Sequence, residues 1–374
     1  METSKKKKYL IIDASNCGWG DRLIQIVSGF YVALLSKRSF KIIGVDLEKV
    51  FEKPNIDWTL DKKELERLQK SKSIKELNYL DKKYYEEGFL YTNFTSNYEN
   101  YEALKYRIQN GKIVTIFENV FHKKQLYEMG LRPDIAYGCA YEYLFKPKPN
   151  VMNIVSEYYN DMEIKRDYYM SQKEYESNSK IDYLPSNDEP IRIGIQIRTG
   201  DNVFNQDESN YCKEDAINMK NIKQYFDCAQ SIEDDIFKTP YNKPEGSLSM
   251  QSDKKMEKRK IYWFLITDCK LIREQAKEKW PDKIITITDK NIDHFEKEKA
   301  SEESINLTIA EHWLFGEMDY HIVSRASCYG RTASLRRKIF HHIYEVEITQ
   351  PYYKKCGIRD FDTFETSSKY WIEL

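Results

Sequence analysis

The sequence has no excess of charge of one sign and no long hydrophobic run. Its 59 Lys and Arg residues balance 60 Asp and Glu residues, so the formal net charge is -1. A broad nucleic-acid interface needs a basic excess, and its absence here argues against nucleic acid as a partner. No apolar run reaches the roughly twenty residues of a membrane helix, and the apolar stretch after residues 1–8 is too short for a signal peptide. We therefore expect a cytoplasmic protein with no integral membrane segment. The lysines at 5–8 fit a solvated tail, which we favour, or a nuclear signal.

Metal-binding and redox patterns are also missing. The seven cysteines are dispersed and form no CxxC pair, and the six histidines show no metal-ligand spacing. These absences exclude zinc ribbons and thioredoxin-like motifs. An odd number of scattered cysteines is typical of free thiols in a reducing compartment. We expect no bound metal and no cofactor.

What the sequence does contain is an alternation of apolar strands and amphipathic helices. Residues 9–12 form a strand candidate, which a turn-rich loop at 13–20 follows. A helix is predicted next, because apolar residues recur every three or four positions, and a second strand is predicted at 40–45. This order predicts a parallel sheet with a right-handed crossover. The apolar helix positions are Leu23, Ile26, Val27, Phe30, Leu34 and Leu35.

A polar stretch at residues 176–189 divides the chain into two such halves. The fold class is therefore α/β, with one domain at 1–182 and a second at 183–374, and the aromatic tail at 346–374 is expected to pack back across a domain. In the first half we also predict helices over 59–110, a strand at 112–117 and a helix at about 151–175. In the second half we predict strands at 191–198, 261–266, 283–287 and 320–323, and helices near 218–232, 307–318 and 333–340.

The strand at 191–198 carries the clearest functional signal. Four isoleucines alternate with polar residues, so we predict a half-buried strand. Arg198 ends it, just before a turn at Thr199 and Gly200. Ligands of α/β proteins bind at the carboxyl ends of strands, and a guanidinium there can hold a phosphate through two parallel hydrogen bonds. The alternative is an edge-strand arginine in a surface ion pair.

Five motifs, taken in order, resemble the α1,2/α1,6/O-fucosyltransferase superfamily of GT-B glycosyltransferases, and within it the plant cell-wall (xyloglucan) fucosyltransferases. The resemblance runs from about residue 9 to about residue 345, with long charged segments unmatched. Asp21 departs from the asparagine that is usual there, and Gln196 stands where many relatives have histidine, although the plant enzymes also have glutamine. The motifs are Gly18–Arg22 with Arg38, Lys53–Trp58, Cys139 with Tyr143–Phe145 and Pro147, Ile193–Arg198, and Asp319–Ser324 with Ser327–Arg331.

The resemblance implies two Rossmann-like domains with a cleft between them, a GDP-fucose donor bound mainly by the second, and inversion at the anomeric carbon without a metal. It assigns Arg198 to the β-phosphate, Glu311 to guanine, and the loop at 327–330 to phosphate contacts. Each assignment has an ordinary structural alternative: Asp268 as a helix cap, Glu311 as a solvated helix face, Ser327 as a turn residue. The implied donor-binding residues are Gly18, Gly20, Arg22, Gln196, Arg198, Asp268, Glu311, Ser327, Cys328, Tyr329 and Gly330.

The acceptor needs a base, and the resemblance does not supply one directly. The core α1,6 enzymes have a glutamate in the loop after the phosphate-binding strand, where this chain has Gln206. The neighbouring Asp207 or Glu208 can take that role, so our catalytic candidates are Arg198, Asp207 and Glu208. We expect transfer of fucose from GDP-fucose to a glycan or glycoprotein acceptor. Two alternatives stay open: a GT-B transferase with another nucleotide sugar, and a non-catalytic protein that binds nucleotide sugars or glycans.

Overall fold

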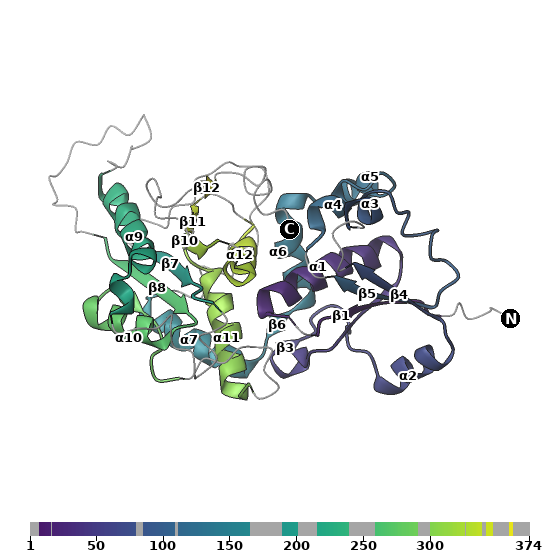
Figure 1. Ribbon diagram of the computed structural model, residues 1–374, viewed down its shortest axis with the longest axis horizontal. Coiled ribbons are helices and arrows are strands. Elements are labelled where there is room, and N and C mark those ends of the chain that lie inside the picture. The colour runs from purple at the N-terminus through teal and green to yellow at the C-terminus, as the bar shows by residue number, and fades with distance from the viewer. Residues whose placement is uncertain are drawn as a thin grey trace, which may run out of the picture.

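In a computed structural model, the described residues form two mainly parallel β-sheets, each flanked by helices, and a small two-stranded antiparallel sheet (Figure 1). Short pieces complete the first half: η1 (Leu47–Lys49), β3 (Phe51–Glu52), α3 (Tyr85–Leu90), α4 (Ile113–Phe117), α5 (Lys123–Glu128), α6 (Pro133–Leu144) and β6 (Lys146–Pro147). The structure describes residues 7–15, 17–79, 85–108, 111–164, 189–200, 215–238, 259–290, 300–325, 327–338, 342–346 and 359–361.

The first sheet has four parallel strands in the order β2-β1-β5-β4. Helix α1 (Trp19–Leu35) packs on one face, where Leu10 and Ile12 join its apolar residues in one cluster. The opposite face carries Tyr9 and Ile11, which pack against Leu68 of α2 (Lys62–Lys70). This alternation follows from the period of two along a strand. The strands are β1 (Tyr9–Asp13), β2 (Ser39–Ile43), β4 (Ile74–Tyr79) and β5 (Ala103–Ile108).

The second sheet has the order β12-β11-β10-β7-β8-β9, parallel except for the antiparallel pair of β11 and β12. Its strands are β7 (Ile191–Ile197), β8 (Ile261–Thr267), β9 (Ile284–Ile285), β10 (Tyr320–Ser324), β11 (Ile343–Val346) and β12 (Arg359–Phe361). Its helices are η5 (Ala216–Asn218), α9 (Lys220–Lys238), α10 (Lys270–Lys279), α11 (Glu302–Phe315) and α12 (Cys328–Leu335).

Strand β7 is buried on both faces, so the half-buried strand predicted from its alternation is wrong. The isoleucines pack with residues of α9 and α10, and on the other face Phe315 of α11 leaves no room for a side chain at Gly194. The polar residue Arg192 is 1% exposed, and its guanidinium donates to the carbonyl oxygens of Met162 and Glu163. The polar positions of β7 therefore lie on a second buried face, where hydrogen bonds offset the cost of burying polar groups.

One apolar cluster spans the two halves. Helix α7 (Pro149–Asp161), from the first half of the sequence, lies beside α11, and Tyr158 packs edge-on against Phe264 of β8 at 5.1 Å. Residues of α1, α7, α11 and α12 belong to a single cluster of buried side chains. The boundary at 182/183 stays a prediction, because residues 165–188 lie outside the described part.

Several elements differ from those predicted. The apolar run at 113–117 is a short helix, α4, because a run of this length fits a buried helix as well as a strand. Strands β4 and β5 lie where only helices were predicted, and α7 ends at Asp161. Helix α12 begins at Cys328, five residues earlier than predicted (333 − 328). The aromatic tail lies almost wholly outside the described residues.

The expectation of free thiols holds for four of the cysteines and is wrong for Cys269. Cys17, Cys139, Cys228 and Cys328 are thiols that form no disulfide. Cys269 is disulfide-bonded. Spacing along the sequence does not reveal such a bond, because pairing depends on which residues the fold brings together. Among the described residues, no helix combines the length and apolar character needed to cross a bilayer.

Candidate functional site

Three neighbouring strands of the second sheet end at the same edge. Strand β7 lies between β10 and β8, and both pairs are parallel, so their carboxyl ends lie together. Arg198 directly follows β7, and its Nη1 donates to Oδ2 of Asp268, which follows β8, at 2.7 Å. The Arg198 side chain is 30% exposed, whereas that of Asp268 is 5% exposed. Arg198 is therefore not an edge-strand residue in a surface ion pair; it is held by a buried carboxylate at a central position.

Asp268 also organises the turn after Arg198. Its carboxylate accepts hydrogen bonds from the backbone N–H of Thr199 at 2.9 Å and from the Thr199 hydroxyl at 2.8 Å. Gly200 follows with φ 121°, a conformation that favours glycine. Helix α10 begins at Lys270; its N-cap residue is Cys269, and no side-chain hydrogen bond caps it. The interpretation of Asp268 as a helix cap is therefore wrong. Asp268 fixes both the backbone and the guanidinium at this strand end.

Gln196 connects the strand ends to helix α12. Its side-chain oxygen accepts from the backbone N–H of Ser324 at 3.0 Å, and its Nε2 donates to Oγ of Ser327 at 3.2 Å. A Cβ atom at Gly330 would lie 2.5 Å from the Gln196 oxygen, so the glycine lets the amide lie against the first turn of α12. Ser327 is the N-cap residue of α12, and its hydroxyl serves this contact instead of capping the helix.

The first turns of α1 and α12 meet next to this edge. A Cβ atom at Gly20 would lie 2.3 Å from the carbonyl carbon of Cys328 and 2.4 Å from the backbone nitrogen of Tyr329. The first four N–H groups of any helix lack helical partners, and the helix dipole adds partial positive charge at this end. Two such ends side by side, near the Arg198 strand end, favour an anion.

The other residues of the glycine loop support α1. Gly18 is its N-cap, and Nε of Arg22 donates to the Cys17 carbonyl oxygen at 2.7 Å, which closes the loop onto the helix. Burial raises the pKa of the Cys17 thiol to about 11, so this thiol is protonated at neutral pH. In α12, the Tyr329 hydroxyl donates to the Thr308 carbonyl oxygen at 2.6 Å, which directs the phenol towards α11.

Glu311 lies apart from these groups, in the core. It is 4% exposed, so the interpretation as a solvated helix face is wrong. Both its oxygens accept from the Arg273 guanidinium, with Oε2 at 3.0 Å from Nη2, and the Tyr158 hydroxyl lies 3.3 Å from Oε1. Arg273 also donates to the Thr267 carbonyl oxygen at 2.7 Å, one residue before Asp268. This buried ion pair joins α7, α10 and α11 beneath the end of β8.

The remaining candidates fall into two groups. Asp207 and Glu208 lie outside the described residues, so the structure does not place them. His321, within the last motif, is a packed strand residue: burial lowers its pKa well below the usual value, and its ring nitrogens lie 2.6 Å from the Ser334 hydroxyl and 2.9 Å from the Met318 carbonyl oxygen. The described residues contain no group of three or more His, Cys, Asp or Glu side chains arranged to hold a metal ion.

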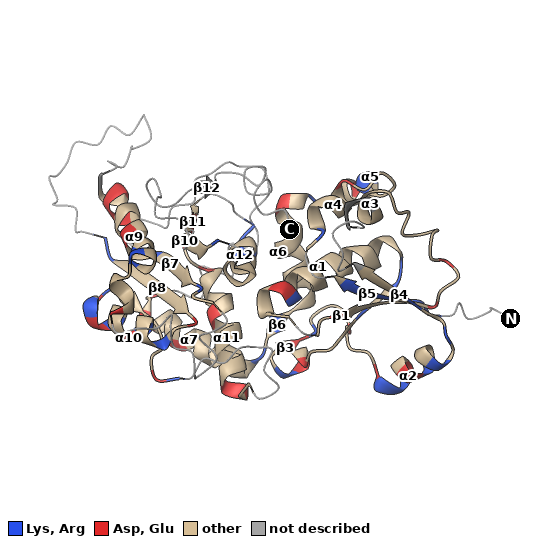
Figure 2. Ribbon diagram, in the orientation of Figure 1, with Lys and Arg blue, Asp and Glu red and all other residues tan. Residues whose placement is uncertain are grey.

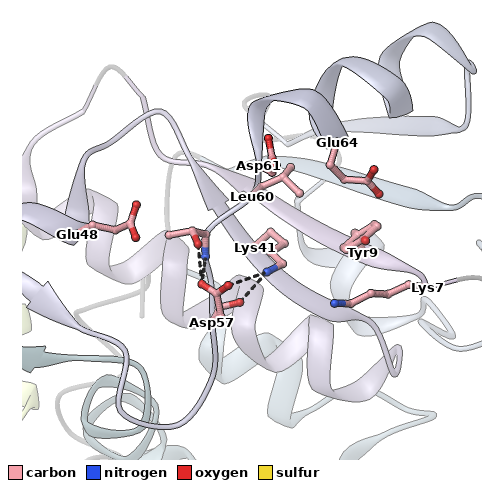
Figure 3. Close-up of a pocket in the computed structure, with 9 residues that line it drawn as sticks. Lys7, Tyr9, Lys41, Glu48, Asp57, Leu60, Asp61 and Glu64 are labelled. Atoms are coloured by element: carbon pink, nitrogen blue, oxygen red, sulfur yellow. Dashed lines mark hydrogen bonds and ion pairs between the residues drawn. The ribbon is translucent and has the colours of Figure 1, made fainter.

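A cavity of about 360 Å³ lies elsewhere, at the Tyr9 end of β1, whereas the glycine loop follows the opposite end (Figure 3). Its carboxylates are already bound within the chain. Asp57 accepts from the Thr59 hydroxyl and pairs with Lys53 at 3.0 Å, Asp61 caps α2, and Glu64 pairs with Arg67 at 2.8 Å. Both signs of charge also alternate over α2, α9 and α10 (Figure 2). The strand-end site therefore remains the candidate.

Three residues that contribute to this site were missed by sequence reasoning as functional residues. Ser324, at the end of β10, accepts a hydrogen bond from the Arg198 backbone N–H at 2.8 Å. The Tyr225 hydroxyl, from α9, lies 2.7 Å from the Ser324 hydroxyl. Arg273 carries the ion pair with Glu311. A serine at a strand end was visible in the sequence, but nothing in the helical pattern of Tyr225 or Arg273 distinguished them from surface residues.

Comparisons with known proteins bear on the fold of this chain. No family model matches the chain, and no match was found among curated proteins. Among solved structures, a mutant of FUT1 from Arabidopsis thaliana in complex with GDP is similar, with 16% identity, a TM-score of 0.57, and coverage of 90% of this chain and 70% of that one. The chain therefore shares the fold of this FUT1 structure. The resemblance stated from the sequence motifs is thus confirmed at the level of the fold.

Two further solved structures match most of the chain with lower TM-scores. NodZ alpha-1,6-fucosyltransferase, soaked with GDP-fucose, is 12% identical over 88% of this chain and 92% of that one, with a TM-score of 0.43; the enzyme comes from Bradyrhizobium. POFUT1 in complex with GDP-fucose is 9% identical over 90% of this chain and 96% of that one, with a TM-score of 0.40.

Proposed function

We propose that this GT-B protein is an inverting, metal-independent fucosyltransferase that transfers fucose from GDP-fucose to a glycan or glycosylated acceptor. One observation carries the proposal: the Arg198 guanidinium is held by Asp268 at the carboxyl end of a central strand, and the first turns of α1 and α12 meet next to this edge. The proposal is supported by the fold shared with FUT1, whose structure contains GDP.

The chemistry of the donor explains why these groups suit it. In an inverting transfer, an acceptor hydroxyl oxygen bonds to the anomeric carbon, and the bond from that carbon to the β-phosphate oxygen breaks. GDP departs with the electron pair, so negative charge builds on the β-phosphate. A cation and N–H groups fixed in advance stabilise this charge without reorganising at the moment of reaction. We assign this role to Arg198 and to the first turns of α1 and α12.

The acceptor hydroxyl must also lose a proton. We assign its removal to Asp207 or Glu208, in the loop that begins after Gly200. A carboxylate acting as general base contributes about 10²–10⁴-fold to such a step. Without one, the proton passes to solvent after departure of GDP.

The first test concerns the donor and metal. GDP is expected to bind the purified protein in excess EDTA with the affinity that it shows in Mg²⁺, because Arg198 and the helix N-termini supply the positive charge. Calorimetry of GDP in both buffers checks this. Binding that appears only with a divalent cation would contradict metal independence, and release of GDP from GDP-fucose in the presence of a glycan panel then tests transfer itself.

The second test concerns the base. Asp207→Asn or Glu208→Gln is expected to lower transfer to an acceptor by about 10²–10⁴-fold while hydrolysis of GDP-fucose changes far less, since bulk water accepts the proton of an attacking water. The measurement is the ratio of transfer to hydrolysis, with GDP affinity as the control for folding. If both amide variants keep the parent's ratio, the loop carboxylates are not the base.

The third test concerns guanine recognition by Glu311. Both Glu311 oxygens accept from Arg273, so a role in guanine recognition requires one of them to accept from the base as well. Glu311→Gln then places an N–H₂ donor at the donor edge of guanine, and discrimination of GDP over ADP is expected to fall by about 1–3 kcal/mol. Because Arg273 loses its ionised partner, the free energy of unfolding should also fall, by about 1.5–3 kcal/mol. Nucleotide titrations and urea unfolding separate the two effects. Lower stability with unchanged discrimination would assign Glu311 to the core alone.

A further inference from the structure

Two buried hydroxyl groups lie directly behind the Arg198 strand end, on residues that have no role in the transfer proposed above. Tyr225 is 0% exposed and Ser324 is 1% exposed. Tyr225 belongs to α9, and Ser324 is the last residue of β10, so the pair connects a covering helix to the sheet. Their oxygen atoms are 2.7 Å apart.

The hydrogen-bond partners determine where the protons lie. The Arg198 backbone N–H donates to the Ser324 oxygen at 2.8 Å, and the Gln196 carbonyl oxygen, 3.2 Å from the same atom, can only accept. The single Ser324 proton therefore points to Gln196. The Tyr225 hydroxyl then donates to Ser324, because its other acceptor, the Val346 carbonyl oxygen, is more distant at 3.5 Å. In this arrangement each of these donors has an acceptor within hydrogen-bond distance.

The consequence is that Ser324 holds the main chain of β7 on both sides of Ile197. Its hydroxyl contacts the carbonyl of Gln196 and the N–H of Arg198, and its own N–H donates to the Gln196 side chain at 3.0 Å. Tyr225 fixes the rotamer in which the Ser324 hydroxyl makes these contacts. The backbone from which the Arg198 guanidinium extends is thus held from behind by the tyrosine.

We propose that Tyr225 is a positioning residue, which acts through Ser324 to place Arg198 for the donor phosphate. The inference rests on the proposed function, because it takes Arg198 as the phosphate-binding group. Tyr225 lies behind the sheet edge and contacts no substrate; its contribution is to the geometry of Arg198 alone. The proposal assigns a role in turnover to a buried phenol that would otherwise count as core.

The test compares two identical substitutions at buried tyrosines. Tyr225→Phe removes the hydroxyl behind Arg198. Tyr31→Phe is the matched control, because Tyr31 is 1% exposed and its hydroxyl donates to the Ala136 carbonyl oxygen at 2.6 Å, in the first half of the chain. Turnover of GDP-fucose and GDP affinity are measured for both, together with urea unfolding. We expect Tyr225→Phe to lower turnover roughly threefold to tenfold, the equivalent of one hydrogen bond, and Tyr31→Phe to leave it unchanged.

Two further measurements separate positioning from general destabilisation. In an Arg198→Ala background, Tyr225→Phe is expected to change turnover less than twofold, because the guanidinium through which it acts is absent. Hydrogen exchange of the peptide that contains the Arg198 amide is expected to accelerate in Tyr225→Phe and in Ser324→Ala, but not in Tyr31→Phe. A full threefold to tenfold loss in the Arg198→Ala background, or equal exchange in the two tyrosine variants, would overturn the proposal. If the parent protein binds neither GDP nor GDP-fucose, the proposed function fails, and hydrogen exchange alone decides whether Tyr225 orders this strand end.

Discussion

Arg198→Ala is expected to lower turnover of GDP-fucose by roughly a hundredfold, on the order of 3 kcal/mol of transition-state stabilisation. The reason is geometric. The guanidinium is partly exposed at a strand end. Asp268, the turn that it binds, and Ser324 hold the backbone from which the guanidinium extends. Removing the guanidinium leaves this backbone scaffold intact, so the loss falls on the developing phosphate charge. Steady-state kinetics of the folded variant check the expectation.

Two further variants make this test more specific. Arg198→Lys should restore little of the activity, since an ammonium supplies one point charge where a planar fork makes two parallel hydrogen bonds. Arg67→Ala is the control, because Arg67 also pairs with a carboxylate, Glu64 at 2.8 Å, but lies on α2 in the other half of the chain. Turnover of the Arg198→Ala protein within threefold of the parent would remove Arg198 from the catalytic candidates.

The strand ends that form the site were predictable because their signals are local. Apolar runs bounded by turns identified β1, β2, β7, β8 and β10, and parallel order places such carboxyl ends together. That reasoning placed Arg198 at the end of one strand and Asp268 just after another, and the structure shows that these strands are neighbours. The short helix α4 was missed because its five residues, four of them apolar, are too few to show a helical period that would distinguish it from a strand.

The roles of individual polar residues were less predictable, because they depend on contacts across long stretches of sequence. Asp268 was weighed as a helix cap, yet it binds a turn 69 residues earlier. Glu311 was weighed as a solvated charge, yet its partner Arg273 lies 38 residues away and both are buried. Helical periodicity reports the face that a side chain occupies and not which residue meets it there. Only the packed structure supplies the second partner.

The contact between α1 of the first half and α12 of the second half was also not predictable from the sequence. The resemblance implied that Gly18 and Gly20 bind the donor at the start of a helix, where glycine permits close approach of a ligand. In the structure, Gly20 instead permits close approach of another helix, since a Cβ there would overlap the backbone of Cys328 and Tyr329. The glycine thus sets how near the first turns of α1 and α12 come to each other. Close approach of a ligand and close approach of α12 both place backbone N–H groups of the first turn of α1 at this site.

Gly20→Ala is therefore expected to be among the most damaging single substitutions in this chain. The added methyl carbon would lie 2.3 to 2.5 Å from backbone atoms, which have no rotamer by which to move away, so α1 and α12 must separate. Overpacking of this kind lowers the free energy of unfolding by about 1–3 kcal/mol. A displacement of about 1 Å between groups that bind one donor costs roughly a hundredfold in turnover, so activity is expected to fall further than stability.

Gly18→Ala is the matched control for that prediction. It adds the same methyl group two residues earlier in the same loop, where the nearest atom, Oδ2 of Asp21, lies at an ordinary contact distance of 3.6 Å. Its φ of -64° suits any residue, and alanine in place of glycine at an N-cap costs little compared with overpacking. GDP titration, turnover and urea unfolding of both variants are the measurements. If Gly20→Ala binds GDP and turns over as Gly18→Ala does, the first turns of α1 and α12 do not form one anion-binding unit, and Arg198 would carry the phosphate contact without them.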